Sequence, residues 1–397
     1  MVVTSLFFMW GFITVLVDSL IPRLREIFEL SYFEAGLVQF AFFIAYGLVS
    51  LPAGNLLAKI GYKKGMLVGL ATMGFGCLLF WPAASLRIFP LFMLGYFTLA
   101  AGMTILQVAA NPYVAVLGDP AGASSRLNLS QAFNSFGAFL APVIGAKYLL
   151  SDNILSGDEI GLLGEAEKIT YYAAESSAVQ GPFIVLALCL IGLAVLIAVF
   201  KLPTVLGSAA TGGYGAVLNN RRLVMGAAGI FVYVGAEVAI GSYLVNYFLD
   251  MNLSEIIKEN SGMNKFSSSL LGKPLAEVDA KGIVAAFVAF YWGGAMVGRF
   301  VGSVLTRVLK PGTVLAMFGI GAIAMVLISM GTTGIVSMWT ILFVGLFNSI
   351  MFPTIFTLGI EELGDLKPQG SGVLCAAIVG GAIIPPLYGL LADSAGF

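Results

Sequence analysis

Two short stretches of this chain, Gln107-Val-Ala-Ala-Asn-Pro112 and Asn348-Ser-Ile-Met-Phe-Pro353, share one pattern at an offset of 241 residues. Each stretch has an amide side chain five residues before its proline. In each, a glycine follows six residues after the proline, at Gly118 and at Gly359. One match of this kind does not by itself establish a repeat.

Two further matches lie at nearly the same offset. At 244 residues apart, a Gly-Ala-x-x-x-Pro-x-x-Gly pattern recurs, and at 248 residues apart a Gly-x4-basic pattern recurs. Because the three matches keep the same order, the sequence predicts an internal duplication. The matching pairs are Gly137–Gly145 with Gly381–Gly389, and Gly54–Lys59 with Gly302–Arg307.

The composition places these repeats in a membrane. Of 397 residues, 59% are hydrophobic and 10% are charged, whereas soluble domains carry about 25% charged residues. Mean hydropathy is +0.97. The formal net charge of −1 gives no basic footprint for nucleic acid. The chain has no histidine, and its three cysteines lie far apart in apolar runs, which argues against a metal cluster or a disulfide framework. We therefore expect an all-α integral membrane protein.

Apolar runs of about 20 residues with few charges predict membrane-spanning helices. Basic residues concentrate in the loops 59–64, 201–222 and 307–310, which the positive-inside rule places in the cytoplasm. The N-terminus is then also inside, and the acidic loops 151–178 and 250–281 face out. The eleven predicted spans are 2–22, 32–58, 65–85, 89–117, 126–150, 179–200, 223–249, 282–306, 311–331, 335–360 and 369–392.

A parallel repeat of six spans, joined by a cytoplasmic linker, resembles the plan of the major facilitator transporters. The sequence predicts halves at 1–200 and 223–397, joined by the linker 201–222. The second half holds five spans, so we expect that a twelfth span is missing from this sequence, by truncation rather than by loss. The loop Gly54–Lys64 resembles the superfamily signature between spans two and three, except that Ala58 stands where the family usually has an acid. The candidate gate residues in this loop are Lys59, Gly61, Lys63 and Lys64.

Longer strings resemble the fucose–galactose–proton symporter family, and in particular its glucose/galactose branch. The resemblance implies bacterial inner-membrane sugar uptake coupled to a cation gradient. This chain also departs from the proton-coupled fucose branch at two positions. That branch has an acid at the position of Gln107 and an amide at the position of Glu237. The strings that carry the resemblance are Phe12–Pro22, Ala109–Pro112, Leu127–Gly137, Tyr233–Ser242, Tyr291–Phe300 and Phe347–Thr354.

Three charged residues fall well inside predicted spans, where a charge costs about 2.5–3.5 kcal/mol and is a functional candidate by default. Asp18 is a candidate cation or proton site, or an acid wetted at the outer end of its span. Glu237 is a candidate sugar acceptor or coupling group, or a structural partner for Arg299. Arg299 lies within Gly294-x3-Gly298-x3-Gly302, a close-packing pattern, so we expect it to fix a helix interface or to reach the cytoplasmic edge rather than to contact sugar.

Sugar hydroxyls require neutral donors and acceptors together with aromatic faces. Spans four and five offer several amides, and the second half offers one amide and a tryptophan that is either a stacking platform or a packing residue. Asn134 is also a candidate for cation coupling beside Asp18. The candidate sugar-binding residues are Gln107, Asn111, Gln131, Asn134, Glu237, Trp292 and Asn348.

The sequence thus predicts a secondary symporter for a neutral hexose of the glucose/galactose class, working as a monomer by alternating access. It needs no cofactor other than the transported cation, with sodium favoured over protons because Gln107 cannot titrate. A passive sugar facilitator, a proton-coupled fucose-type symporter and a sugar sensor remain alternatives. A membrane enzyme would need a catalytic constellation that the sequence does not offer.

Overall fold

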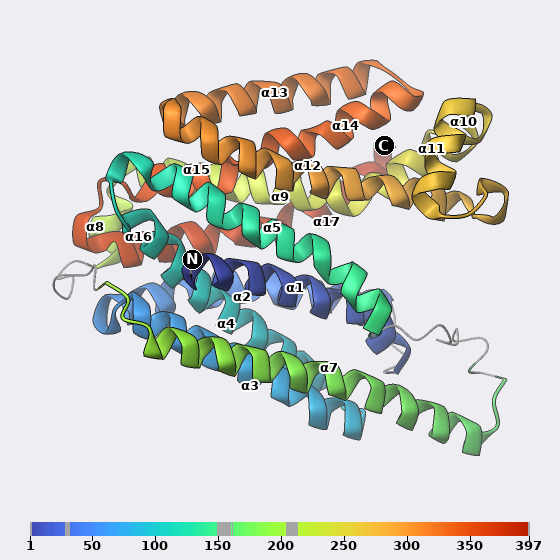
Figure 1. The fold of residues 1–397 in the computed structure, drawn as a ribbon, viewed down its shortest axis with the longest axis horizontal. Helices are drawn as coiled ribbons and strands as arrows, with labels where there is room; N and C mark the ends of the chain where they lie inside the picture. The colour runs from blue at the N-terminus through green and yellow to red at the C-terminus, as the bar shows by residue number, and fades with distance from the viewer. Residues whose placement is uncertain (1, 28–31, 149–159, 161, 204–212, 396–397) are drawn as a thin grey trace. The chain divides into compact units, whose positions relative to one another are not determined.

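The computed structural model describes the backbone of residues 2–27, 32–148, 160, 162–203 and 213–395. Side chains at 2, 17–27, 32–36, 39, 143–148, 175–179 and 395 lie outside that description. Within the described residues the chain is helical and has no strand (Figure 1). The described part therefore confirms the all-α class.

Within the described residues, the first half contributes six long helices. Between α2 and α3 the chain turns at Gly61, whose φ of 82° is a conformation that favours glycine. These helices are α1 (Val2–Ile27), α2 (Tyr32–Ile60), α3 (Tyr62–Leu86), α4 (Phe89–Val116), α5 (Ala123–Tyr148) and α7 (Glu165–Val199).

Helices of the second half include two spans that are broken near their middle. The tenth predicted span is divided at Ser349–Ile350, and the eleventh at the 3-10 turn Ala377–Val379. The helices are α8 (Tyr214–Leu218), α9 (Arg221–Asp250), α10 (Leu253–Glu259), α11 (Ser261–Leu271), α12 (Ala280–Val308), α13 (Pro311–Gly331), α14 (Gly334–Asn348), α15 (Met351–Ile360), α16 (Lys367–Ala376) and α17 (Gly380–Ala395).

Every predicted span corresponds to one helix or to one broken pair of helices. Among the described residues, nine helical segments are long and apolar enough to cross a membrane, and α1 contributes a shorter apolar stretch, Val3–Leu16. The two predicted outer loops are partly helical, because α7 begins at Glu165 and because α10 and α11 occupy most of 250–281. The chain is thus a multi-pass membrane protein.

The chain forms two compact units. Unit 1 comprises 1–123, 133–227 and 359–379. In it α3 packs along α4 and α7, while α2 packs on α4 and α16 (Figure 1). Glycines allow the closest approach: a Cβ at Gly76 would lie 2.5 Å from the backbone nitrogen of Leu99. Small residues of this kind let helices pack in lipid, where apolar side chains gain nothing from leaving water.

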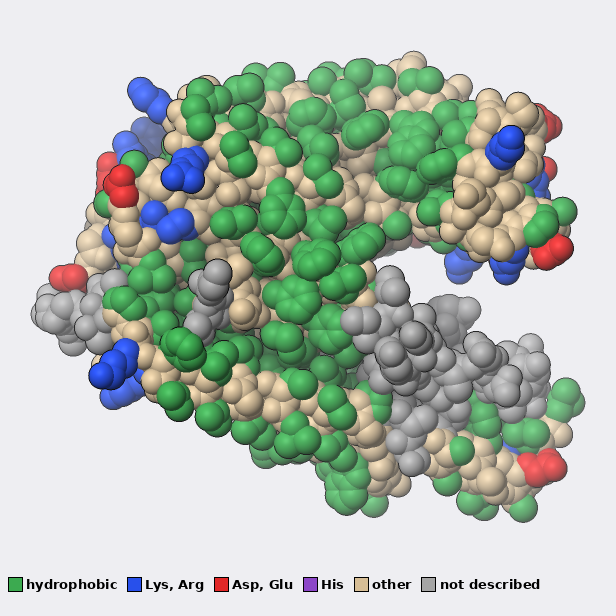
Figure 2. All heavy atoms as spheres, in the orientation of Figure 1, with side chains coloured by type: hydrophobic (Ala, Val, Ile, Leu, Met, Phe, Trp, Pro, Cys, Tyr) green, Lys and Arg blue, Asp and Glu red, His purple; other side chains and the backbone are tan. Residues whose placement is uncertain are grey.

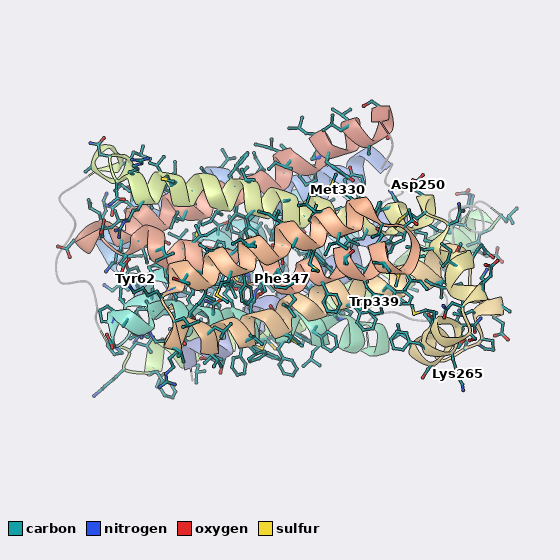
Figure 3. All side chains as sticks on the ribbon, turned by 90° about the horizontal axis from the view of Figure 1, so that it is seen from above. Tyr62, Asp250, Lys265, Met330, Trp339 and Phe347 are labelled. Carbon is teal, nitrogen blue, oxygen red and sulfur yellow. The ribbon has the colours of Figure 1, made fainter. Side chains whose placement is uncertain are left out.

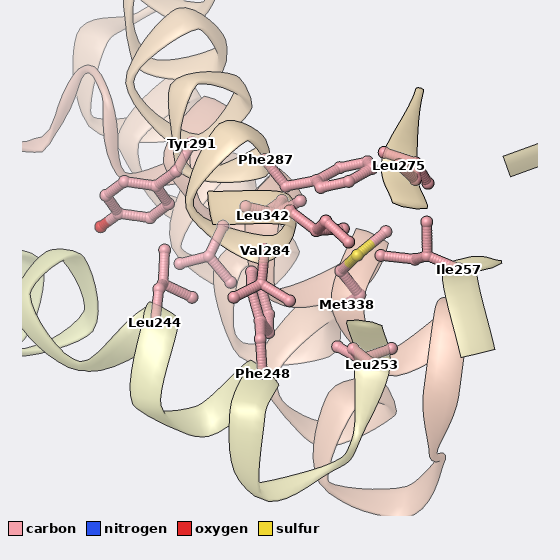
Figure 4. Close-up of a cluster of buried hydrophobic side chains, with 12 residues drawn as sticks. Leu244, Phe248, Leu253, Ile257, Leu275, Val284, Phe287, Tyr291, Met338 and Leu342 are labelled. Atoms are coloured by element: carbon pink, nitrogen blue, oxygen red, sulfur yellow. The ribbon is translucent and has the colours of Figure 1, made fainter. Parts of the chain in front are cut away.

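Unit 2 comprises 124–132, 228–358 and 380–397. Here α14 packs between α12 and α13. At one end of the unit, α10 and the turn after α11 place Leu253, Ile257 and Leu275 against α9, α12 and α14 (Figure 4). Seen from above, Asp250 and Lys265 mark this end (Figure 3). The loop predicted at 250–281 is therefore a folded cap on unit 2.

The units do not follow the halves of the sequence repeat, because each half contributes a segment to the other unit. In unit 2, the start of α5 bonds to second-half residues: the Ser124 and Thr357 hydroxyls are 2.6 Å apart, and Asn128 Nδ2 donates to Thr354 Oγ1 at 3.1 Å. In unit 1, α16 packs on α2 and α4. The predicted halves, 1–200 and 223–397, therefore describe the sequence repeat and not the two compact units.

Hydrophobic side chains cover the lengths of the helices on the face shown in Figure 2, whereas Lys, Arg, Asp and Glu gather at helix ends. The side chain of Lys63 donates to the carbonyls of Ala198 and Phe200, each at 2.9 Å, and so closes the end of α7. This arrangement suits helices that cross a bilayer, since lipid offers no partner for polar groups.

Candidate functional site

The repeated prolines create the same local problem in both units. Proline has no backbone N–H, so the carbonyl four residues earlier loses its helical partner. In α4, Pro112 leaves the Val108 carbonyl open, and the Ser371 hydroxyl of α16 donates to it at 2.8 Å in a buried position. The helix continues unbroken through Pro112.

Gln107 and Asn111, two amides of unit 1 predicted as sugar contacts, lie near the hydrogen bond from Ser371 to the Val108 carbonyl. Gln107 is buried, and its Oε1 has no hydrogen-bond partner among the described residues. Asn111 is fully buried and interacts with the thiol of Cys375 on α16. Since a buried polar atom without a partner costs about 1–3 kcal/mol, Gln107 presents a group that a ligand can satisfy.

Asn134 lies where α5 crosses α1. Its Nδ2 donates to the Phe7 carbonyl at 3.0 Å, and a Cβ on Gly11 would lie 2.1 Å from the Asn134 carbonyl oxygen. Asp18 also belongs to α1, but its side chain lies outside the described residues. Asp18 lies seven positions after Gly11, which is about 10 Å along a helix axis.

Gln131 lies on the same helix as Asn134 but in the segment that belongs to unit 2, and its side chain is buried. The two amides are three residues apart on α5, a spacing that places them on one face of a helix. Their joint role in binding sugar stays a prediction.

In unit 2, Pro353 opens the carbonyl of Ser349, at the break between α14 and α15. Arg299 of α12 donates its Nε–H to that carbonyl at 3.1 Å. Close packing makes this possible, because a Cβ on Gly298 would lie only 2.3 Å from the Leu346 carbonyl oxygen and from Ser349 Oγ. The structure thus places Arg299 and Gly298 at a helix interface, and Gly294 packs on Leu346 one turn away.

Asn348 is the amide that matches Gln107 in the repeat, and it has a hydrogen-bond partner. Asn348 Nδ2 donates to the Tyr291 hydroxyl at 2.7 Å, while its Oδ1 has no partner within the described part of the chain. Tyr291 is fully buried, and its hydroxyl points away from the apolar cluster of this unit (Figure 4).

Glu237 of α9 completes this polar group. It interacts electrostatically with Arg299 and with the hydroxyl of Tyr233, and Tyr291 lies within range of its charge. Its Oε1 is buried and has no hydrogen-bond partner of ordinary geometry among the residues described. Unit 2 therefore combines a half-buried carboxylate and a half-buried guanidinium with two buried phenols and a buried amide in one polar group.

Trp292 lies beside this cluster on a different face of α12. Its ring packs on Gly241 of α9 and edge-on to Tyr291, and 47% of the side chain is exposed. The sequence left open whether it stacks on sugar or packs between helices. The structure gives it a packing contact and leaves an open face.

Residues Ser371, Tyr291 and Tyr233 were not among the sequence-predicted site residues. Tyr291 had a usable signal, because it falls on the same face of α12 as Gly294 and Gly298 at helical spacing. Ser371 had a weaker one, because the carbonyl that Pro112 leaves open requires a donor from some neighbouring helix. Nothing in the sequence indicates which helix supplies it.

Comparisons with known proteins agree with this architecture. Residues 2–386 match the family model of the Major Facilitator Superfamily. A glucose/galactose transporter of Brucella abortus biovar 1 (strain 9-941) is 48% identical over 396 residues, covering 99% of this chain and 87% of the relative. An L-fucose-proton symporter of Escherichia coli (strain K12) is 35% identical over 406 residues, covering 99% and 86%.

The solved structure of FucP, a major facilitator transporter in the outward conformation, superposes with a TM-score of 0.86 at 34% identity. The alignment covers 100% of this chain and 92% of that structure. The similarity extends over both halves of the sequence repeat.

Proposed function

This chain belongs to the major facilitator superfamily, and from that premise we propose that it takes up a neutral hexose of the glucose/galactose class by cation-coupled symport. It is a membrane transporter and not an enzyme. Relatives named as a glucose/galactose transporter and as an L-fucose-proton symporter support the substrate class and the coupling. We place the chain in a bacterial inner membrane, acting as a monomer.

One observation carries the sugar assignment. Gln107, Glu237 and Asn348 each keep a buried oxygen without a hydrogen-bond partner among the described residues. Such atoms are costly unless a ligand or water satisfies them. A hydroxyl both donates and accepts, so a polyhydroxylated ring suits carboxylate and amide groups alike. Asn111, Gln131 and Asn134 are further candidates for hydroxyl contacts.

The proposed coupling group is Asp18, with Asn134 as a second candidate, and sodium as the favoured cation. A carboxylate with neutral oxygens suits a hard cation. One monovalent cation that crosses 100 mV supplies about 2.3 kcal/mol, which supports roughly 50-fold accumulation at about 1.4 kcal/mol per tenfold. A proton-coupled symporter and a passive facilitator are the alternatives, and they differ in their response to gradients.

The test is uptake of radiolabelled D-glucose and D-galactose into reconstituted vesicles. We expect stimulation by an inward sodium gradient when the pH gradient is clamped at zero. Stimulation by a proton gradient alone would assign protons instead. Equal uptake with and without either gradient would establish a facilitator, and no saturable hexose uptake at all would exclude the proposal.

Asp18→Asn separates coupling from binding. We expect this variant to lose accumulation while it retains hexose exchange, because only the charged cation site is removed. Asp250→Asn, at the exposed end of α9, serves as the matched control. Accumulation at the wild-type level in the Asp18 variant would rule out Asp18 as the coupling site.

A further inference from the structure

We propose that Tyr291 is a positioning residue for sugar binding: its hydroxyl holds the side-chain amide of Asn348 so that the amide oxygen, and not the amide nitrogen, faces the hexose. The inference rests on the proposed function, since it states how one candidate sugar contact recognises its ligand. Both residues lie in unit 2, and a hydrogen bond joins them directly.

That hydrogen bond is buried. Asn348 Nδ2 donates to the Tyr291 hydroxyl oxygen at 2.7 Å, and only 4% of Asn348 and 0% of Tyr291 are exposed. An amide carries its acceptor oxygen and its donor nitrogen on opposite arms. Because the nitrogen is bound to the phenol, Oδ1 is turned away from it, and this buried oxygen has no hydrogen-bond partner among the residues that the structure describes.

Tyr291 can hold the amide because its ring is fixed by packing. A Cβ at Gly345 of α14 would lie 2.1 Å from the Tyr291 carbonyl oxygen and 3.0 Å from Cδ2 of its ring. Asn348 follows three residues later, about 4.5 Å along the helix axis, and meets the hydroxyl at the far end of the same ring. Trp292 packs edge-on to that ring, with centroids 5.1 Å apart. The phenol is therefore a fixed point for the amide that ends α14.

The sequence repeat indicates that packing alone does not require this hydroxyl. By the 248-residue offset of the Gly-x4-basic pattern, the counterpart of Tyr291 is Phe43. Both halves thus place an aromatic ring at this position, and only the second half adds a hydroxyl to it. That hydroxyl contacts Asn348, the repeat counterpart of Gln107. The second half therefore holds this amide with a group that the first half does not have at the matching position.

Holding the nitrogen restricts what Asn348 recognises. Its open oxygen is an acceptor only, so it requires a ligand group that donates a hydrogen. A sugar hydroxyl donates, whereas a fluorine in its place can accept but not donate. A buried site built to bond one hydroxyl rejects an analogue that lacks the hydrogen, because the protein group is then left unpaired. An amide that is free to rotate would instead present either end to the ligand.

The experiment titrates wild type, Tyr291→Phe, Asn348→Ala and the double variant with D-galactose and D-glucose. Each purified protein is also titrated with the deoxy and deoxyfluoro analogues of both hexoses at every hydroxyl-bearing carbon. Tyr247→Phe is the matched control, because the Tyr247 hydroxyl lies 2.9 Å from Ser337 Oγ in the same unit. Thermal unfolding in detergent reports the structural cost of each change separately from sugar affinity.

We expect wild type to bind the deoxy and deoxyfluoro analogues of one hydroxyl equally poorly, each at least tenfold more weakly than the parent hexose, because neither donates to Oδ1. Asn348→Ala should remove this penalty and thereby identify the hydroxyl. Tyr291→Phe should let the fluoro analogue bind about threefold more tightly than the deoxy analogue, since the released amide can turn its nitrogen toward fluorine. Tyr247→Phe should lower stability without changing this discrimination.

A double-mutant cycle separates positioning from packing. Tyr291→Phe alone should weaken binding of the parent hexose at least fivefold, yet have no further effect when Asn348 is already alanine, because the phenol acts only through the amide. A loss of affinity that is the same with and without Asn348 would overturn the inference and make the role of the phenol structural.

Two results with wild type and Asn348→Ala alone would also overturn it, so the test survives if Tyr291→Phe does not fold. One is tighter wild-type binding of the fluoro than of the deoxy analogue at the hydroxyl that Asn348→Ala identifies. The other is an Asn348→Ala variant that changes the penalty at no hydroxyl. A wild type that binds neither hexose would defeat the proposed function itself, whereas hexose binding that is unaffected by Tyr291→Phe would defeat this inference alone.

Discussion

The two units close the same open carbonyl with different chemistry. In unit 1 the Val108 carbonyl, which Pro112 leaves open, accepts from the neutral hydroxyl of Ser371. In unit 2 the matching Ser349 carbonyl, left open by Pro353, accepts from the charged guanidinium of Arg299. The repeat leaves one carbonyl without its helical partner in each unit. The donor comes from α16 in unit 1 and from α12 in unit 2.

The difference follows from one position of the repeat. By the offset that relates Gly54 to Gly302, the counterpart of Arg299 is Leu51, which has no donor. Unit 1 therefore takes its donor from α16. Because a hydroxyl carries no charge, unit 1 requires no counter-charge beside Gln107 and Asn111. A guanidinium inside a membrane does require one, and the carboxylate of Glu237 lies within electrostatic range of Arg299.

Breaking the hydrogen bond from Arg299 to the Ser349 carbonyl in unit 2 should have the largest effect on stability. In Gly298→Val, the new side chain would meet the Leu346 carbonyl oxygen and Ser349 Oγ at impossible distances, which forces α12 away from α14. We expect a loss of about 3 kcal/mol, at the upper end of overpacking costs, together with loss of sugar binding. Thermal unfolding in detergent measures the effect.

Gly293→Ala is the matched control for that experiment, because a Cβ at this position meets nothing within 4 Å. The same helix thus offers a tolerant and an intolerant glycine five residues apart. Equal melting temperatures for the Gly298 and Gly293 variants would show that close approach is not what holds Arg299 in place.

Breaking the unit 1 closure should cost less. In Ser371→Ala the Val108 carbonyl loses its donor from α16. An unsatisfied buried acceptor costs about 1–3 kcal/mol. Ser394→Ala is the control, since its hydroxyl donates to Leu391 at 2.9 Å in an exposed position. Stability that falls equally in the two variants would contradict a special role for the Val108 closure.

The smallest effect is expected at the counterpart of Arg299. The Tyr214 hydroxyl of the linker helix α8 donates to the Leu51 carbonyl. Tyr214→Phe removes this one bond, which is worth about 0.5–1.5 kcal/mol. A loss above that of Ser371→Ala would reverse the ranking of the two unit 1 contacts.

The Tyr214 contact should also be insensitive to pH in the ordinary range. Burial raises the pKa of Tyr214 to about 12, above its usual value near 10. The protonated form is therefore favoured in the folded protein, and its contribution is complete below pH 10 and is lost as pH rises toward 12. Unfolding measurements between pH 6 and 9 should show the same wild-type-to-variant difference.

Much of the fold could be predicted from the sequence, because hydrophobic periodicity and span length are local properties. Each of the eleven predicted spans coincides with a helix or a broken pair of helices, and nine segments of the described residues are long and apolar enough to cross a membrane. Along the Gly294–Gly298–Gly302 pattern, Gly294 and Gly298 contact Leu346 and Gly302 contacts Ile350. The breaks at Ser349 and at Ala377 were not foreseen. At Ser349 the open carbonyl depends on a donor from the neighbouring helix α12, which the local sequence does not show.

The candidate site could be predicted by residue type but not by partner. Gln107, Glu237 and Asn348 were chosen as polar residues in apolar surroundings, and the structure buries Gln107 and Asn348 and half-buries Glu237. That Asn348 binds Tyr291 and that Arg299 binds Ser349 depend on distances between spans, which no single stretch of sequence encodes. The coupling site at Asp18 remains a prediction.

The segment 359–379 belongs to unit 1 although it is synthesised after the unit 2 segment 228–358. Ser371 emerges 263 residues after Val108. At about 5–20 residues per second, the carbonyl of Val108 waits roughly 13–50 s for its donor. Unit 1 therefore cannot mature as its earlier helices leave the ribosome and must stay partly assembled until segment 359–379 has been synthesised. Slowing elongation between codons 123 and 359 should lengthen that vulnerable interval, whereas slowing it after codon 380 should not.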